Sequence, residues 1–191
     1  MIFRLFRRTR QDPSIALLYG MIVAQARSPA FYQSFRVPDT VNGRLEMILL
    51  HVVLLLRRLD AEPEPVPDSS VRPLGQGIFD LFCQDMDANL REMGVGDLAV
   101  PRTMRRIGEA FYGHQAAYMT ALAANDSQAL VEVLTRNVFD GCAGAERLAT
   151  YVRAAVRALA TRDMTELRAG HFGFPDPGAL SEGALAGEEQ A

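Results

Sequence analysis

The stretch at residues 48–59, ILLHVVLLLRRL, is apolar on nearly every face of a helix. It completes a pattern that starts at Asp39 or Thr40, either of which can cap a helix running through Asp60. A helix that is hydrophobic all round must be covered by other elements, so we predict that this one is central in the core. His51 within it is expected to be a core histidine whose ring nitrogens are hydrogen-bonded.

Two segments imitate membrane-directed sequences. Glu46 and His51 interrupt the apolar run, which is shorter than the ~20 apolar residues that cross a bilayer. Near the N-terminus, arginines precede an uncharged run that ends in an A-x-A pattern at residues 24–26, as in a signal peptide. Asp12 and Pro13 are instead the N-cap and first-turn pair of a helix. We therefore predict core helices at both places.

Helical spacing of apolar residues continues along most of the chain, without a convincing strand pattern. Further helices are expected at residues 13–26, 29–35, 78–93, 101–124, 127–139 and 145–160, with a short last helix capped by Asp163 and Glu166. We expect the large apolar residues of these stripes, such as Phe82, Met86, Leu90 and Met93, to be buried. The fold class is therefore all-α, as a single helical-bundle domain of about seven or eight helices over residues 12–174.

Three segments depart from the helical pattern. Residues 1–11 form a basic N-terminal segment, and residues 61–77 form a proline-rich connection that cannot be regular helix. Residues 175–191 are rich in Pro, Gly, Ala and Glu, and we predict that they form a disordered acidic tail.

Composition favours one globular domain in a reducing compartment. The chain has 191 residues, of which 49% are hydrophobic and 23% are charged, an ordinary globular balance. The chain has arginine but no lysine, which we interpret as the codon bias of a GC-rich genome. Cys83 and Cys142 are too few for a disulfide framework or a zinc site. We predict a cytoplasmic protein.

One segment, residues 81–114, is unusual because an acidic half and a basic half flank a glycine-rich break. Residues 94–99 match the glycine pattern of a dinucleotide-binding loop, but that loop must follow a strand and this one follows a helix. We expect Gly94 to close the preceding helix in the left-handed conformation instead.

The charges of this segment exceed what folding requires, which indicates recognition of a partner. The residues that we assign to this surface are Asp87, Arg91, Asp97, Arg102, Arg105 and Arg106. Arginines one helical turn apart repel each other unless a nearby anion compensates their charges. A solvated face, with Arg105 paired to Glu109, is the alternative.

Catalysis and metal binding are not indicated. A di-iron centre in a helical bundle needs Glu-x-x-His pairs on one face, whereas Glu46 and His51, like Glu109 and His114, are five residues apart. We predict no metal, no cofactor and no enzymatic activity.

The first residues alternate apolar and basic side chains in the manner of an interfacial membrane anchor. The candidate contacts with an anionic membrane surface are Phe3, Arg4, Phe6, Arg7 and Arg8. Disorder of this segment is the alternative.

The sequence LFCQDMDANLREMGVGDLAVPRTMRRIGEAFYG, residues 81–113, resembles the ubiquinol-cytochrome c chaperone family, which includes mitochondrial assembly factors for cytochrome b of the bc1 complex. The positions that match the family pattern are Asp85, Asp87, Leu90, Arg91, Gly94, Asp97, Met104, Phe111, Tyr112 and Gly113. The resemblance implies a suspected role of these positions, Tyr112 included, in partner recognition. An arginine often follows Phe-Tyr-Gly in the family, and here the residue is His114.

The resemblance also implies an all-α domain that binds newly made cytochrome b, with a small partner subunit and near the ribosome. We therefore expect a bacterial, non-enzymatic assembly chaperone, attached loosely to the inner face of the cytoplasmic membrane, with no DNA partner. An enzyme acting on a lipid or isoprenoid is the alternative, and it would need facing clusters of acidic residues. A homo-oligomeric structural bundle would show a large apolar patch.

Overall fold

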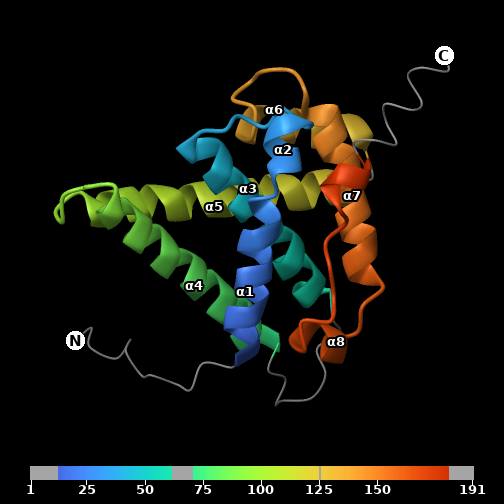
Figure 1. Cartoon of the computed structure of the whole chain (residues 1–191), viewed down its shortest axis with the longest axis horizontal. Coiled ribbons are helices and arrows are strands. Elements are labelled where there is room, and N and C mark those ends of the chain that lie inside the picture. The colour runs from blue at the N-terminus through green and yellow to red at the C-terminus, as the bar shows by residue number, and fades with distance from the viewer. Residues whose placement is uncertain (1–12, 62–70, 125, 181–191) are drawn as a thin grey trace.

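The computed structural model describes residues 13–61, 71–124 and 126–180, and within these ranges the protein is all-α, as predicted (Figure 1). Its helices are α1 (Pro13–Ala26), α2 (Pro29–Gln33), α3 (Val41–Asp60), α4 (Val71–Glu92), α5 (Val100–Ala123), α6 (Ser127–Asn137), α7 (Ala145–Ala160) and α8 (Met164–Arg168). The predicted basic segment at residues 1–11, with its candidate membrane contacts, lies outside the described residues.

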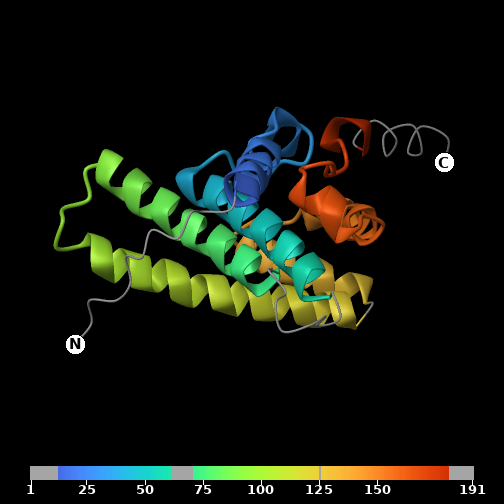
Figure 2. The same ribbon diagram turned by 90° about the horizontal axis from the view of Figure 1, so that it is seen from below.

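Helix α3 is the central element, and α1, α4, α5 and α7 all pack against it. Every residue from 46 to 56 is buried, because neighbouring helices cover all sides of this apolar stretch. In Figure 2, α5 lies along one side of the molecule and α1 along the other, with α3 and α4 between them. No helix in the described ranges combines the length and the apolar composition needed to cross a membrane. The predicted central helix is confirmed.

His51 belongs to a buried chain of hydrogen bonds. Its Nδ1 lies 2.7 Å from the carbonyl oxygen of Met47, and its Nε2 lies 2.7 Å from the hydroxyl of Tyr151. Because a carbonyl only accepts, Nδ1 carries the proton and Nε2 accepts from Tyr151. The amide of Gln25 donates to the Tyr151 hydroxyl at 3.1 Å and to the carbonyl of Pro175 at 2.9 Å. The expected core histidine is confirmed, and burial lowers its pKa to about 4.

Several helices begin at the capping residues that the sequence indicates. The Thr40 hydroxyl accepts a 3.0 Å hydrogen bond from the backbone nitrogen of Gly43 at the start of α3. Asp126 caps α6 in the same way. Asp163 and Glu166 form a reciprocal capping box, with hydrogen bonds of 2.7 and 3.2 Å, at the start of α8. These ends are local features, which is why the sequence predicts them.

The predicted proline-rich connection is too long at its C-terminal side, because α4 already begins at Val71. Pro73 is tolerated there since the first turn of a helix has backbone N–H groups without helical partners. Gly75 and Gly77 are therefore helical and not part of a loop. A Cβ atom on Gly77 would collide with the side chain of Ile15, so this glycine lets α4 pack closely on α1. Residues 62–70 lie outside the described part of the chain.

The predicted disordered tail also begins too early. Asp176 accepts a 2.8 Å hydrogen bond from the backbone nitrogen of Gly178 and starts a helical turn at residues 177–180. Just before it, the ring of Phe174 packs edge-on against His51, with 4.9 Å between their centroids. Residues 175–180 therefore continue the packed structure, whereas residues 181–191 are not among the described residues.

Candidate protein-binding surface

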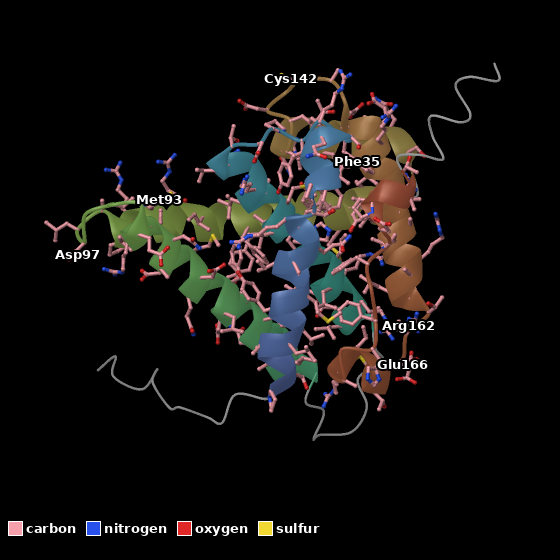
Figure 3. All side chains as sticks on the ribbon, viewed as in Figure 1. Phe35, Met93, Asp97, Cys142, Arg162 and Glu166 are labelled. Atoms are coloured by element: carbon pink, nitrogen blue, oxygen red, sulfur yellow. The ribbon has the colours of Figure 1, made fainter. Side chains whose placement is uncertain are left out.

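Helices α4 and α5 form a hairpin whose tip projects from the rest of the molecule (Figure 1). Helix α4 packs on α1 and α3, and α5 packs on α3 and α6, so the hairpin is anchored in the core. Figure 3 shows Met93 and Asp97 at its far end, on the loop that joins the two helices. The charged and glycine-rich segment singled out in the sequence is this tip.

Gly94 ends α4 in the manner predicted from the sequence. Its φ angle is +80°, which only glycine adopts at little cost. Its backbone nitrogen donates to the carbonyl of Arg91, and that of Val95 donates to the carbonyl of Leu90, both at 3.0 Å. This pair of bonds is a Schellman motif. Because a helix and not a strand precedes Gly94, the dinucleotide-binding reading remains rejected.

Arg91 joins the two acidic residues assigned to this surface. Its Nε lies 2.7 Å from a carboxylate oxygen of Asp87, one turn earlier on α4, and its Nη1 lies 2.5 Å from a carboxylate oxygen of Asp97 in the loop. Hydrogen bonding to Asp87, with the charge of Asp97, raises the pKa of Arg91. The structure therefore brings three predicted site residues together, with one positive charge between two negative ones.

Apolar side chains are exposed at the tip, which the sequence reading missed. Leu98 is 99% exposed and Met93 is 53% exposed. We expected Met93 to be a core residue, and the correction has a simple cause. Helix α4 ends at Glu92, so the spacing that buries Phe82, Met86 and Leu90 does not extend to Met93 or into the loop that holds Leu98. Leu98 and Met93 therefore present apolar side chains at the projecting tip, where a partner has access to them.

The three arginines of this surface lie on the first two turns of α5 and are all exposed. Arg105 lies 3.5 Å from the carboxylate of Glu109, and both side chains are mostly exposed. This is the ion pair expected for a solvated face, and an exposed pair of this kind contributes little to the stability of the fold. Arg102 and Arg106 have no ion pair or side-chain hydrogen bond within the described ranges.

Tyr112 lies two turns further along α5, away from the tip. Its ring is 61% exposed and borders an aromatic cluster, with centroids 5.7 Å from Phe79 and 5.6 Å from Phe111. The ring therefore extends the buried aromatic cluster to the surface, where a partner could cover it.

Asp85 matches the family pattern but has a structural task. Its carboxylate accepts a 2.8 Å hydrogen bond from the hydroxyl of Tyr19 on α1 and a 3.1 Å bond from the amide of Asn89. Burial, followed by the interaction with Asp85, raises the pKa of Tyr19. Asp85 thus fixes α4 to α1 at the base of the hairpin.

Glu46 and His114, which we weighed as metal ligands, form a contact between α3 and α5. A carboxylate oxygen of the buried Glu46 lies 3.0 Å from Nδ1 of His114. Next to them, Tyr118 is fully buried, and burial with the charge of Glu46 raises the pKa of its hydroxyl. In the described ranges, no three His, Cys, Asp or Glu residues are grouped so that they could hold a metal ion.

Comparison with known proteins assigns the chain to a family. Residues 33–174, which include the whole α4–α5 hairpin, match the family model described as ubiquinol-cytochrome C chaperone. The chain belongs to this family. The family consists of chaperones and not of enzymes, in agreement with the resemblance noted in residues 81–113 and with the predicted lack of enzymatic activity.

Individual relatives agree with this assignment. The chain is similar to the crystal structure of the Cbp3 homolog from Brucella abortus, with 39% identity and a TM-score of 0.78 over 93% of this chain and 98% of that one. A similarity to a bacterial protein fits the predicted bacterial origin. Ubiquinol-cytochrome-c reductase complex assembly factor 1 of Xenopus laevis is 25% identical over 78% of this chain and 74% of its own length. Its counterpart in Drosophila melanogaster is 28% identical over 75% of this chain, which spans only 56% of that protein.

Proposed function

We propose that this protein is a non-enzymatic chaperone for assembly of the ubiquinol-cytochrome c reductase (bc1) complex, and that its client is newly made cytochrome b. The relatives named as assembly factors of that complex support the first part. The observation that carries the proposal is the projecting α4–α5 hairpin, whose tip exposes 99% of Leu98 among charged side chains.

The tip suits reversible binding. Complete burial of one leucine or methionine side chain contributes roughly 1.5–3 kcal/mol. A micromolar complex needs about 8 kcal/mol, so Leu98 and Met93 alone do not retain a client permanently. The surrounding charges add specificity and speed of association more than lasting affinity. A chaperone that must release its client needs this balance of a small apolar contact and a charged rim.

Other partners are part of the proposal. The family resemblance supports a small partner subunit and a position near the ribosome during synthesis of the client. The alternating apolar and basic residues at positions 1–11 support peripheral attachment to the inner, anionic face of the cytoplasmic membrane. These residues are outside the described ranges, so this attachment rests on the sequence.

The alternative enzyme needs acidic side chains that face one another across a cavity. The three aspartates of α4 each have a different partner instead. Asp80 accepts a hydrogen bond from Gln76, Asp85 accepts one from Tyr19, and Asp87 binds Arg91. The described residues therefore give this alternative no specific support.

Deletion of the gene tests the proposal. We expect the deletion strain to lose bc1 complex and the absorbance of its b-type haem, and the wild-type gene to restore both. The Leu98→Ser variant should restore them poorly, while Arg157→Gln, an exposed change on α7, should restore them fully. Normal bc1 levels in the deletion strain would contradict the function. Pulse-labelling followed by affinity capture tests the client, and capture of a bc1 subunit other than cytochrome b would show that the client is wrong.

A further inference from the structure

We propose that the α5 side of the tip binds an acidic, amphipathic segment of a partner protein, whose carboxylates pair with Arg102 and Arg106 and whose apolar side chain covers Leu98. The inference deepens the proposed function, because the segment would belong to the client. It concerns the chemistry of that segment, which the family assignment leaves open.

The first support is the state of the two arginines. Arg102 and Arg106 are exposed, one helical turn apart, and neither has an ionic partner in the described ranges. Like charges at this spacing repel each other, so the free protein keeps a small electrostatic penalty that an anion would remove. Two carboxylates separated by about 6 Å, the rise of one helical turn, would satisfy both arginines.

The second support is the contrast with α4. Arg91 binds Asp87 and Asp97 at 2.7 and 2.5 Å, so these two acids already have an ionic partner within the molecule. A basic partner would have to compete with Arg91 for both acids. An acidic partner meets no such competition at Arg102 and Arg106. The α4 side therefore keeps a net negative charge around Arg91, whereas the α5 side attracts carboxylates.

The chemistry of the tip favours a protein segment over an anionic lipid surface. Leu98 lies beside Asp97, whose side chain is 87% exposed, and Glu92 is also exposed. Insertion of Leu98 between anionic headgroups would press these carboxylates against like charges. A peptide can place its acids over α5 alone and keep them away from Asp97.

A second copy of this chain is a poorer match than a distinct partner. On the α4 side of this hairpin, Asp87 and Asp97 are bound by Arg91 and Asp80 by Gln76, and only Glu92 is exposed without a partner in the described ranges. The single carboxylate of Glu92 cannot pair with both arginines of another copy. The segment that fits has two acidic residues three or four positions apart in a helix, beside an apolar residue.

Photo-crosslinking at the tip tests the inference. The full-length protein would carry p-benzoylphenylalanine in place of Leu98, be crosslinked in living cells, and have its crosslinked peptides sequenced by mass spectrometry. We expect a peptide with at least two Asp or Glu residues within one or two helical turns of the crosslink. A peptide without acidic residues, or a crosslink to another copy of the chain, would overturn the inference.

Charge exchange provides the second test. Arg102→Glu with Arg106→Glu should lower the crosslink yield at least tenfold, whereas the matched Arg157→Glu variant on α7 should leave it unchanged. Replacing the two acids of the captured segment by arginine should restore the yield with the doubly reversed protein. An unchanged yield, in variants whose melting temperature equals that of the wild type, would show that these arginines do not bind the partner.

The outcomes separate this inference from the proposed function. An acidic segment from a protein outside the bc1 complex would support the inference and contradict the proposed client. A cytochrome b segment without acids would do the reverse. Cosedimentation with phosphatidylglycerol vesicles that is lost in both Leu98→Ser and the double arginine reversal would identify a membrane-binding tip and overturn the inference.

Discussion

The hydroxyl of Tyr19 on α1 donates a 2.8 Å hydrogen bond to the carboxylate of Asp85 on α4, and so joins two helices through residues that are 66 positions apart in sequence. Helix α4 is one of the two helices of the projecting hairpin. The orientation of the tip relative to the core therefore depends on this bond and on the packing of α1 against α4.

Removal of the hydroxyl should destabilise the protein. A hydrogen bond to a charged group contributes about 1.5–3 kcal/mol, and the partial burial of this pair favours the lower end. We expect Tyr19→Phe to lower the free energy of unfolding by about 1.5 kcal/mol in urea titrations. Tyr112→Phe is the matched control, because that ring is 61% exposed and should tolerate the change within ~0.5 kcal/mol. Equal changes in the free energy of unfolding for the two variants would mean that the hydrogen bond from Tyr19 to Asp85 does not stabilise the fold.

The buried His51 should make stability depend on pH. Its folded pKa is about 4, against an ordinary value of 6.5. Above pH 6.5 the ring is neutral in both states, so its burial adds no pH dependence there. Between pH 6.5 and 4 only the unfolded chain takes up the proton, so stability falls as the pH falls and levels off below 4.

The expected loss attributable to His51 between about pH 7.5 and about pH 5 is roughly 2 kcal/mol. The test compares the free energies of unfolding at both pH values for the wild type and for His51→Gln, which cannot titrate. The wild type should lose about 2 kcal/mol more than the variant. Parallel losses would mean that His51 is not the group responsible.

Sequence patterns predict the helices here because helix formation and capping are local. Thr40 and Asp163 mark helix starts within a few residues of themselves, and the all-round apolar stretch at residues 48–59 can only be central. The start of α4 is wrong in the sequence reading because Pro73 breaks a helix interior but not a first turn.

The candidate surface is less predictable because it depends on tertiary geometry. The sequence identifies the charged tip, yet it does not show that Asp85 is held by Tyr19, since that pairing requires α1 to cross α4. Nor does it show that Leu98 is exposed, because periodicity assigns burial only to residues within a helix. The sequence also does not show which charged side chains have an ionic partner. The structure shows that Arg91 pairs with both Asp87 and Asp97.

Close packing of α1 on α4 gives a third prediction. A side chain at position 77 would collide with Ile15, so Gly77→Val should overpack the interface and cost about 2 kcal/mol of unfolding free energy. Combining it with Ile15→Ala should cost less than the sum of the single changes, because the collision disappears. Gly113→Ala on α5 is the control. A Cβ atom there meets nothing within 4 Å, so alanine should stabilise the helix by up to about 1 kcal/mol. Additive effects at positions 77 and 15 would contradict the close contact.

The same substitution at two leucines of the hairpin separates folding from recognition. Leu90 is 8% exposed and Leu98 is 99% exposed, although they are only eight positions apart in the sequence. An aspartate in place of Leu90 buries an unpaired carboxylate, so Leu90→Asp should cost several kcal/mol and lower the melting temperature by more than about 10 °C. Leu98→Asp should leave the melting temperature unchanged and still weaken capture of the client, because the apolar contact is lost while the fold remains. Melting curves and affinity capture measure the two effects in parallel. A large drop in the melting temperature of Leu98→Asp would mean that this side chain supports the fold, and it would contradict the assignment of the tip as the binding surface.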